Sequence, residues 1–491
     1  MTLKEAKFSS YAIKKSCIFL KMTFYKEITK EMEHEQIDEM DENMEESSSD
    51  SDEEDSMGSD KIEENEDQKN ESKIYLPGKP LKSGEELVVD KTAYRMLHHA
   101  QSGAPCLSFD IILDDLGNNR EDYPLSIYLV AGTQAAKTHV NNLLVMKMKN
   151  LYDIKDDSDD DSDDDELNSE IDMNTPVMSV APIKHQGCVN RVRYMRIGEK
   201  AFAASWSELG RVHIWDLNKQ LNALDDDELL RTYRKKCEKN DGIIKPVFSF
   251  KGHLSEGYGL DWCSTEVGIL ASGDCKGNIH IWHFSNSNNS AIWHVDQRPY
   301  NSHAPHSVED IQWSPNERHV LASCSVDKSI KIWDTRANPQ SACILTASGT
   351  HTADVNVISW NRKENQFLIS GGDDGLLCMW DLRQFGPNGS SPVAIFKQHT
   401  APITTVEWHP QDANVFASGG ADDQIAQWDL SIEPEQSKEI EYNELKELPP
   451  QLLFIHQGQT DIKELHWHPQ CPGTVISTAH SGFNVFRTIS V

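Results

Sequence analysis

The hydrophobic residues of this chain fall into many short runs that alternate with polar, turn-forming segments. Residues 107–113, 125–130 and 143–148 are three such runs, and stretches rich in Gly, Asn and Asp separate them. Apolar runs of this length between turn signals are typical of β-strands. The pattern therefore predicts a mainly β-sheet protein, with these three runs forming its first sheet.

A different spacing precedes the strand-like runs. Leu87, Tyr94 and Leu97 recur at intervals that suit one face of an amphipathic helix between residues 85 and 100. The sequence Gly103-Ala104-Pro105 then stops that pattern. We therefore expect an N-terminal helix ahead of the β-rich region.

A longer period is superimposed on the short runs. Residues 370–382 contain a Ser, an Asp four places later and a Trp six places after that. The same skeleton occurs upstream at Ser323, Asp327 and Trp333, and downstream at Ser418, Asp422 and Trp428. Trp333, Trp380 and Trp428 are 47 and 48 residues apart, and a period of this kind with a Trp-Asp ending is typical of a β-propeller blade.

Six units of this kind can be counted along the chain. Each begins near a histidine: His185, His253, His303 or His306, His351, His399 and His456. Together with the first sheet, which lacks the Trp-Asp ending, they predict a seven-bladed propeller. Seven four-stranded blades close a ring that leaves no open sheet edge.

The repeated Ser, His and Asp invite comparison with a hydrolase triad. A triad is needed once, however, whereas His351, Ser370, Asp374 and Trp380 recur as His399, Ser418, Asp422 and Trp428. We interpret them as a structural network in which the Trp indole donates, Ser and His relay, and an ionised Asp accepts. Two units depart from the pattern, because Lys276 and Leu209 occupy the Asp position, and these blades are expected to lack the full network.

The net charge of −32 is concentrated in two tracts. Residues 31–71 carry twenty Asp and Glu against two Lys, and residues 156–172 carry eleven acids and no base. Segments with so little to bury cannot offset the entropy of ordering, so we expect both to be disordered. A basic group from Arg231 to Lys239 is open to two interpretations, a charged helical insert or a nuclear import signal.

The remaining composition excludes several classes of protein. Ten scattered cysteines contain no Cys-x-x-Cys pair, which favours a reducing compartment over a disulfide framework. The apolar run 17–20 is too short to span a bilayer. The sequence has no phosphate-binding Gly loop, no metal-ligand spacing and no single nucleophile with a partner. We expect no catalysis, no cofactor, no metal, no membrane and no sequence-specific nucleic acid.

These features predict three regions. Residues 1–72 form a disordered acidic region, residues 73–102 contain the helix that packs on the propeller, and residues 103–491 form the propeller. The propeller carries an acidic loop at 155–172 and a charged insert at 218–246.

Four local features resemble the WD-repeat family and, within it, the histone-binding, retinoblastoma-binding branch. They are Ala93-Tyr94-Arg95-Met96-Leu97-His98, residues 103–110, the strand ends of the Trp-x-Pro type, and the acidic segment 433–457 with its Pro449-Pro450 pair. In that branch a helix and an acidic Pro-Pro loop form a groove for a basic histone helix. The resemblance implies client-binding residues on the helix, the acidic segment and the proline pair: Tyr94, Leu97, Glu433, Glu435, Glu439, Glu441, Pro449 and Pro450. The acidic tract inside the first blade, which the histone-binding branch lacks, is expected to attract a basic client through its carboxylates: Asp156, Asp157, Asp159, Asp160 and Asp161.

The two long acidic tracts are similar to those of the glutamate-rich WD-repeat proteins. That resemblance implies a nucleolar, nuclear protein that acts as a chaperone for the basic large-subunit ribosomal protein L-three during ribosome assembly, with histones as further partners. We expect such a protein to be monomeric. The charge pattern alone does not identify the basic client.

Two other functions stay open. The first is a histone-binding chromatin chaperone. The second is the substrate receptor of a cullin ubiquitin ligase, because residues 332–336 and 379–383 resemble the Trp-Asp-x-Arg box that binds a ligase adaptor.

Overall fold

The computed structural model describes residues 88–154, 175–239, 244–287, 290–386, 390–432 and 448–491, together with the strands β1 (Phe24–Glu27), β2 (Lys73–Ile74) and β3 (Glu85–Glu86). The chain divides into two units, residues 24–89 and the rest. In the smaller unit β1 pairs antiparallel with β2 and with β3. The expected disorder of the acidic tracts concerns residues outside those described.

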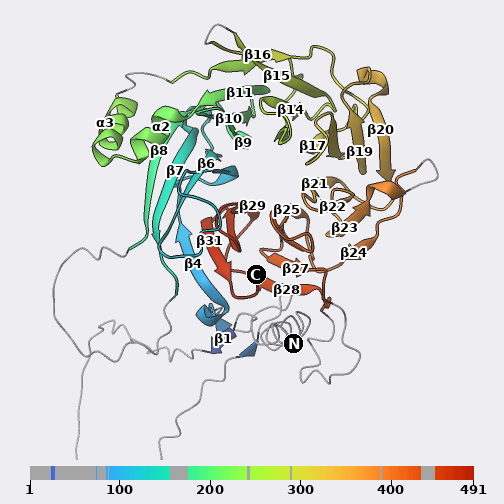
Figure 1. The fold of residues 1–491 in the computed structure, drawn as a ribbon. Helices are drawn as coiled ribbons and strands as arrows, with labels where there is room; N and C mark the ends of the chain where they lie inside the picture. Colours follow the sequence, from blue (N-terminus) through green and yellow to red (C-terminus); the bar gives the residue numbers. More distant parts are fainter. Residues whose placement is uncertain are drawn as a thin grey trace, which may run out of the picture. The chain divides into compact units, whose positions relative to one another are not determined.

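The larger unit contains seven four-stranded antiparallel sheets, which confirms the prediction of a seven-bladed propeller (Figure 1). We number the blades in chain order. The strands of blades 1 to 3 are β5 (Cys106–Ile112), β6 (Leu125–Thr133), β7 (Asn142–Leu151) and β8 (Val177–Lys184); β9 (Val189–Ile197), β10 (Lys200–Ser207), β11 (Arg211–Asp216) and β12 (Phe248–Phe250); and β13 (Gly259–Trp262), β14 (Ile269–Gly273), β15 (Ile279–Ser287) and β16 (Ser290–Val295).

The other four blades follow the same plan. Their strands are β17 (Val308–Trp313), β18 (Val320–Ser325), β19 (Ser329–Asp334) and β20 (Cys343–Ser348); β21 (Val355–Trp360), β22 (Phe367–Gly372), β23 (Leu377–Asp381) and β24 (Ala394–Phe396); β25 (Ile403–Trp408), β26 (Val415–Gly420), β27 (Ile425–Asp429) and β28 (Leu452–His456); and β29 (Ile462–Trp467), β30 (Thr474–Ala479), β31 (Gly482–Thr488) and β4 (Tyr94–Ala100). The inner strands contact one another in sequence, and β29 contacts β5, so the ring is closed.

The expected helix over residues 85–100 is wrong, because residues 94–100 form the strand β4. A short 3₁₀ turn, η1 (Lys91–Ala93), precedes it and is capped by the Asp90 carboxylate. Strand β4 pairs with the C-terminal β31 and supplies the fourth strand of blade 7. Without it β31 would present an open row of backbone donors and acceptors, so tertiary pairing outweighs the local helical spacing.

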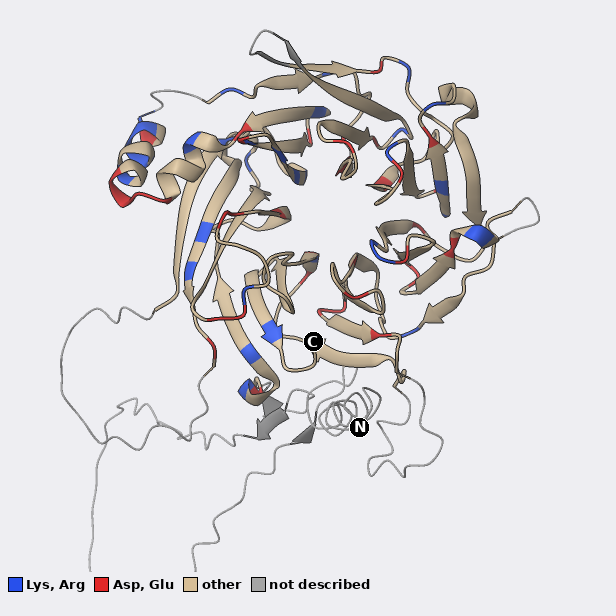
Figure 2. Ribbon diagram, in the orientation of Figure 1, with Lys and Arg blue, Asp and Glu red and all other residues tan. Residues whose placement is uncertain are grey.

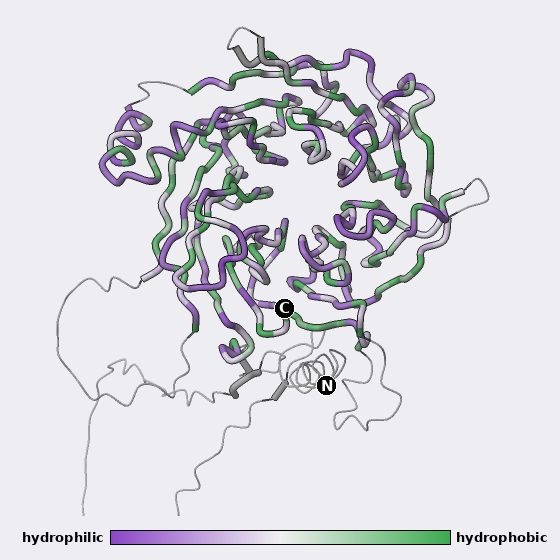
Figure 3. Tube along the Cα trace, in the orientation of Figure 1, coloured by the Kyte–Doolittle hydropathy of each residue, from purple (hydrophilic) through white to green (hydrophobic). Residues whose placement is uncertain are grey.

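Tryptophans hold neighbouring blades together. Trp313, Trp408 and Trp467 end inner strands, and each donates its Nε1–H to a backbone carbonyl of the preceding blade at 3.1 to 3.2 Å. Figure 3 shows the hydrophobic residues following the blade strands, whereas many connecting loops are hydrophilic. The core therefore consists of apolar layers between adjacent blades.

The charged insert of blade 2 forms two helices between β11 and β12. Helix α2 (Asn218–Leu224) and helix α3 (Asp227–Glu238) pack on β8 of blade 1. Leu224 and Leu230 are buried against this blade. The basic residues of the insert therefore lie on a folded helix, which favours the helical interpretation over an extended import signal.

Candidate functional site

The repeated polar residues form buried chains of hydrogen bonds. In blade 5 the Trp380 indole donates to the Ser370 hydroxyl at 2.8 Å, and that hydroxyl lies 2.8 Å from Nε2 of His351. Nδ1 of His351 lies 3.1 Å from the Asp374 carboxylate. The same order joins His399, Ser418, Asp422 and Trp428 in blade 6, and His303, Ser323, Asp327 and Trp333 in blade 4.

Blade 3 also contains the full network, which corrects the expectation based on Lys276. Asp274 takes the place of the missing carboxylate: it lies 3.1 Å from Nδ1 of His253, whose Nε2 lies 2.7 Å from Ser272. The Asp follows the Ser by two residues here instead of four. A search for Ser-Gly-Asp downstream of the His would have found it.

Two blades use other partners. In blade 2 the His185 ring donates to the Gly187 carbonyl instead of to a carboxylate. This agrees with the expectation that the blade lacks the full network, because Leu209 occupies the Asp position. His456, at the end of β28 in blade 6, reaches blade 7, where it lies between the Tyr94 hydroxyl at 2.8 Å and the Asn484 amide at 3.0 Å. Tyr94 on β4 is therefore part of the network that anchors the closing strand.

The electrostatics of these networks are those of a scaffold. Burial lowers the pKa of His253 to about 4, so its imidazole is neutral near pH 7. Burial would raise the pKa of Asp374, but the His351 ring and backbone N–H groups outweigh it and lower that pKa. Ser370 is completely buried, so no substrate can reach its hydroxyl. These observations favour the structural interpretation of the repeated Ser, His and Asp over a catalytic triad.

A second buried network joins three inner strands near the ring axis. The Glu464 carboxylate pairs with Arg191 and Arg193 at 2.8 Å each and accepts from the Ser108 hydroxyl at 2.7 Å. Burial alone would raise the pKa of Glu464, but Arg193 and its neighbours hold it well below its usual range. These contacts connect blades 1, 2 and 7 at the point where the ring closes.

His466 extends this network to blade 6. Its Nδ1 lies 3.2 Å from Glu407, and its Nε2 lies 3.6 Å from Glu464. Burial opposes the charge of the imidazole, but the two carboxylates outweigh it and raise the pKa of His466 to about 10. His466 is therefore charged at neutral pH, unlike His253.

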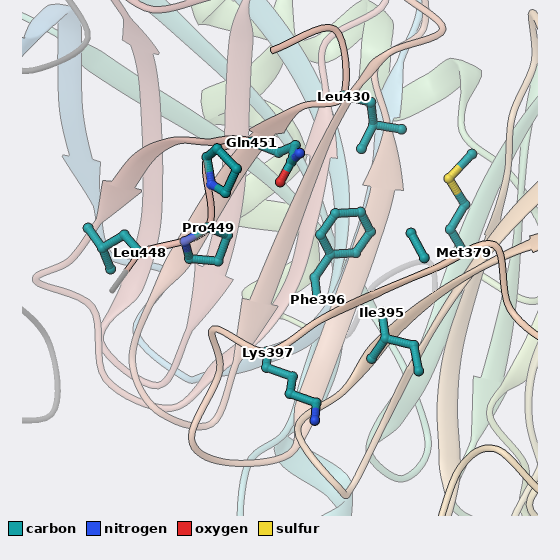
Figure 4. A pocket seen from close by; sticks show the side chains of 10 residues that line it. Met379, Ile395, Phe396, Lys397, Leu430, Leu448, Pro449 and Gln451 are labelled. Atoms are coloured by element: carbon teal, nitrogen blue, oxygen red, sulfur yellow. The ribbon is translucent and has the colours of Figure 1, made fainter. Parts of the chain in front are cut away.

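An apolar groove lies on the outside of blades 5 and 6 (Figure 4). Its volume is about 820 Å³. Three segments that are distant in sequence meet there: strand β24 with Met379 beside it, Leu430 after β27, and the segment before β28. The lining residues are Met379, Ala394, Ile395, Phe396, Lys397, Leu430, Leu448, Pro449, Pro450 and Gln451.

Two features make this groove a candidate binding site. Ile395 is 44% exposed on the outer strand of its blade, so apolar surface is open to a partner. The glutamate-rich residues 433–447 connect Leu430 and Leu448 in sequence, although they lie outside the described residues. An apolar floor whose lining residues are followed in sequence by carboxylates suits a ligand that carries both apolar and basic side chains.

Acidic side chains also gather toward the ring axis. Figure 2 shows Asp and Glu on several of the inner loops around the central opening. Burial raises the pKa of Glu309, and the carboxylates of Asp354 and Asp373 add to that effect. The Asn356 amide donates to Asp373 at 2.7 Å. Glu309 belongs to β17 of blade 4, and Asp354 and Asp373 flank β21 and β22 of blade 5, so the three acids come from neighbouring blades.

The predicted client-binding residues are placed differently from one another. Tyr94 is 5% exposed with its hydroxyl on His456, so it belongs to the core, which corrects its expected place on a binding helix. Leu97 is half-buried against the core of blade 7. Pro449 and Pro450 line the groove. The predicted acids at 156–161 and 433–441 lie outside the described residues.

The two Trp-Asp-x-Arg boxes present their arginines to solvent. Arg336 and Arg383 are 64% and 70% exposed, and each holds the Asp two positions earlier through two nitrogens. A guanidinium fixed in this way offers its remaining donors to a partner. The boxes lie on blades 4 and 5.

The described residues offer neither a metal site nor a membrane span. Among them, no group of three or more His, Cys, Asp or Glu is placed to hold a metal ion. No helix within the described ranges is long and apolar enough to cross a membrane.

Comparisons with known proteins agree with this architecture. Residues 84–152 match the family model of the histone-binding protein RBBP4, a family that is also described as a component of the CAF1 complex. Residues 296–334, 341–381 and 390–429 match the WD domain, G-beta repeat. The first match includes β4 and most of blade 1, and the others cover blades 4, 5 and 6.

Three curated proteins are similar over most of the chain. Ribosome assembly protein rrb1 of Schizosaccharomyces pombe is 41% identical over 88% of this chain and 88% of its own length. Protein HEAT STRESS TOLERANT DWD 1 of Arabidopsis thaliana is 42% identical over 86% and 92%. Glutamate-rich WD repeat-containing protein 1 of Dictyostelium discoideum is 41% identical over 86% of each chain.

Proposed function

Because the chain belongs to the family of glutamate-rich WD-repeat proteins, we propose that it acts in ribosome assembly as a non-enzymatic chaperone for a strongly basic protein. The client proposed is the large-subunit ribosomal protein L-three. Such a protein would work in the nucleus and the nucleolus. The name of the fission yeast relative supports the process, and the acidity of this chain supports the class of client.

The observation that carries the proposal is the apolar groove at Pro449 and Pro450. Its floor is built from β24 and the end of the loop before β28, so its shape is fixed by two blades. Residues 433–447 contribute six Glu and two Lys next to it in sequence. A basic amphipathic segment of the client would place its apolar side chains on this floor and its Lys or Arg against the carboxylates.

The acidic segments and the propeller have different tasks in this mechanism. Carboxylate tracts attract Lys and Arg at long range and raise the encounter rate, an effect that salt screens. They also compete with RNA phosphates for the same cations, which keeps a free ribosomal protein from binding RNA indiscriminately. The groove then supplies the contacts that select one client.

The groove is tested by Ile395→Asp with purified ribosomal protein L-three. A carboxylate on the apolar floor removes the burial of one aliphatic side chain, so we expect the dissociation constant to rise about tenfold or more. Ile344→Asp is the matched control, because Ile344 is also half exposed on an outer strand but lies outside the groove. Equal affinity of the two variants would contradict the role of the groove.

Measuring the affinity for a histone pair in the same way distinguishes the histone-chaperone hypothesis from the ribosomal one. If wild-type protein binds histones more tightly than ribosomal protein L-three, and Ile395→Asp weakens only histone binding, the client is a histone and the ribosomal assignment is wrong.

The exposed arginines of the Trp-Asp-x-Arg boxes favour a second candidate function, that of a ligase substrate receptor. Co-purification of a cullin ligase adaptor that disappears with Arg336→Ala and Arg383→Ala would support it. Since both side chains are exposed, the double variant should fold normally. Absence of any adaptor from wild-type purifications would exclude it.

A further inference from the structure

Helix α3 is fixed to the propeller by one face. Leu230 is buried, and the Tyr233 hydroxyl donates to the Pro182 carbonyl at 2.6 Å. The Arg234 Nε–H donates to the Val180 carbonyl at 3.0 Å. Both carbonyls belong to β8, the outer strand of blade 1, so the helix covers a strand edge that would otherwise be open.

The opposite face of α3 carries most of the cations of the insert. Arg231, Lys235 and Lys239 follow one another at intervals of four residues, and Lys236 lies beside them. All four are exposed, and their side chains make no hydrogen bond or ion pair with the described residues. Figure 2 shows Lys and Arg in blue on helix α3, which projects from blades 1 and 2, together with Asp and Glu in red. We name these four residues the basic row.

The acids of α3 balance the basic row only in part. Asp227 and Glu228 lie four and three residues before Arg231, and Glu238 lies three residues after Lys235, whereas Lys236 and Lys239 have no acid at these spacings within the helix. Like charges four residues apart on a helix repel one another. The helix dipole also favours the basic residues in the last turn, Lys235 and Lys236. The surface therefore suits a polyanionic partner.

The acidic tract 156–172 is the polyanion tethered closest to this row along the chain. It contains eleven acids and no base, and it connects β7 to β8 within blade 1. The chain after it re-enters blade 1 at Val177, three residues before the carbonyl that holds Arg234. The five residues from Asp172 to Val177, where β8 begins, can span up to roughly 16 Å, so the end of the tract is held close to the strand on which α3 packs.

We propose that the acidic tract 156–172 docks on the basic row of α3 and that a basic client displaces the row from the tract. The short tether gives an effective concentration in the millimolar range, so weak ion pairs suffice. Helix α3 then competes with the client for the acidic tract. Only a client whose cationic surface is denser than the basic row releases the tract from the helix. This inference rests on the proposed function, because the docking regulates the tract that attracts the client.

Contact between the two segments is tested by zero-length carbodiimide crosslinking of the full-length protein. We expect mass spectrometry to find Lys235, Lys236 or Lys239 joined to carboxylates of 156–172 at about 50 mM salt. The same crosslinks should be lost in about 0.5 M salt, where surface ion pairs are screened. If these lysines crosslink elsewhere, or not at all, the proposal is wrong.

The competition is tested with poly-lysine as the probe. The variant replaces all four residues of the basic row by Glu. If the tract is bound to α3 in nine-tenths of the molecules, this variant should lower the apparent dissociation constant for poly-lysine about tenfold. The matched control places Glu at four exposed basic positions outside the helical insert, Lys251, Lys276, Arg362 and Lys363. Both variants change the net charge equally, so an equal gain in the control would overturn the proposal.

Deletion of 156–172 distinguishes a failure of the proposed docking from a failure of the client-binding role of the tract. In the deleted chain, reversal of the basic row should have no further effect, and a persisting effect would contradict the docking. If deletion leaves poly-lysine affinity unchanged while the crosslinks of the intact chain persist, the docking stands and the client role of the tract fails. If intact protein binds poly-uridine RNA through the basic row and shows no crosslinks, the row is an RNA surface and the proposal is overturned.

Discussion

Ser370→Ala is the sharpest perturbation of the repeated network. The Ser370 hydroxyl accepts from the Trp380 indole at 2.8 Å and lies 2.8 Å from Nε2 of His351. The Nδ1–H of His351 donates to the Asp374 carboxylate, because a carboxylate can only accept. The Nε2 of the neutral ring therefore accepts a hydrogen bond, which the Ser370 hydroxyl donates. Alanine therefore leaves one buried donor and one buried acceptor without partners.

The expected loss of stability follows from those two groups. Each buried polar group left unsatisfied costs about 1–3 kcal/mol, so Ser370→Ala should lower the free energy of unfolding by about 2–6 kcal/mol. Urea unfolding followed by tryptophan fluorescence measures this difference. Ser390→Ala is the control, because the one hydrogen bond of that buried hydroxyl to a described residue is long, at 3.4 Å to the Thr346 carbonyl.

Two results would refute this argument. The first is a Ser370→Ala protein as stable as the Ser390→Ala control, which would mean that the network contributes nothing. The second is a folded Ser370→Ala protein that has lost its client, which would mean that the repeated residues take part in binding.

Three further predictions concern the closure and the charge of the ring. Tyr94→Phe leaves a buried histidine nitrogen unpaired where β4 closes blade 7, so the thermal midpoint should fall by the equivalent of about 1–3 kcal/mol, measured by calorimetry. Glu464→Gln leaves Arg191 and Arg193 without their carboxylate and should cost about 3–5 kcal/mol in urea unfolding; an unchanged midpoint would contradict this. Because burial lowers the pKa of His253 to about 4, the unfolded chain takes up the proton first, and stability present above pH 6.5 should be lost as the pH falls toward 4. Thermal midpoints that stay constant from about pH 7.5 to 4.5 would exclude this effect.

The ring could be predicted from sequence because its signal is repeated. Three units share a Ser, Asp and Trp at fixed spacing, so the common architecture outweighs the variation of any one blade. The same reliance on spacing hid Asp274, which reaches His253 from a position two residues earlier than expected. The Asp274 carboxylate contacts Nδ1 of its histidine as Asp374 does in blade 5, although its position in the sequence differs.

Strand β4 and the groove could not be predicted from local patterns. Residues 94–100 have helical spacing, and only the open edge of β31, almost four hundred residues away, makes them a strand. The groove brings together Met379, Ile395 and Leu448 from three segments, and no stretch of sequence contains them together. Both features depend on the tertiary fold.

One titration tests the central claim, that the unrepeated acidic segments and the groove bind the client while the repeated residues maintain the fold. Ribosomal protein L-three is titrated into wild-type protein, a chain lacking 156–172 and 433–447, and Ser370→Ala at a temperature where all three are folded. We expect the deletion to weaken binding at least tenfold and to reduce its salt dependence, while Ser370→Ala binds as wild type does. Equal binding by the deleted chain, or weak binding by folded Ser370→Ala, would contradict the claim.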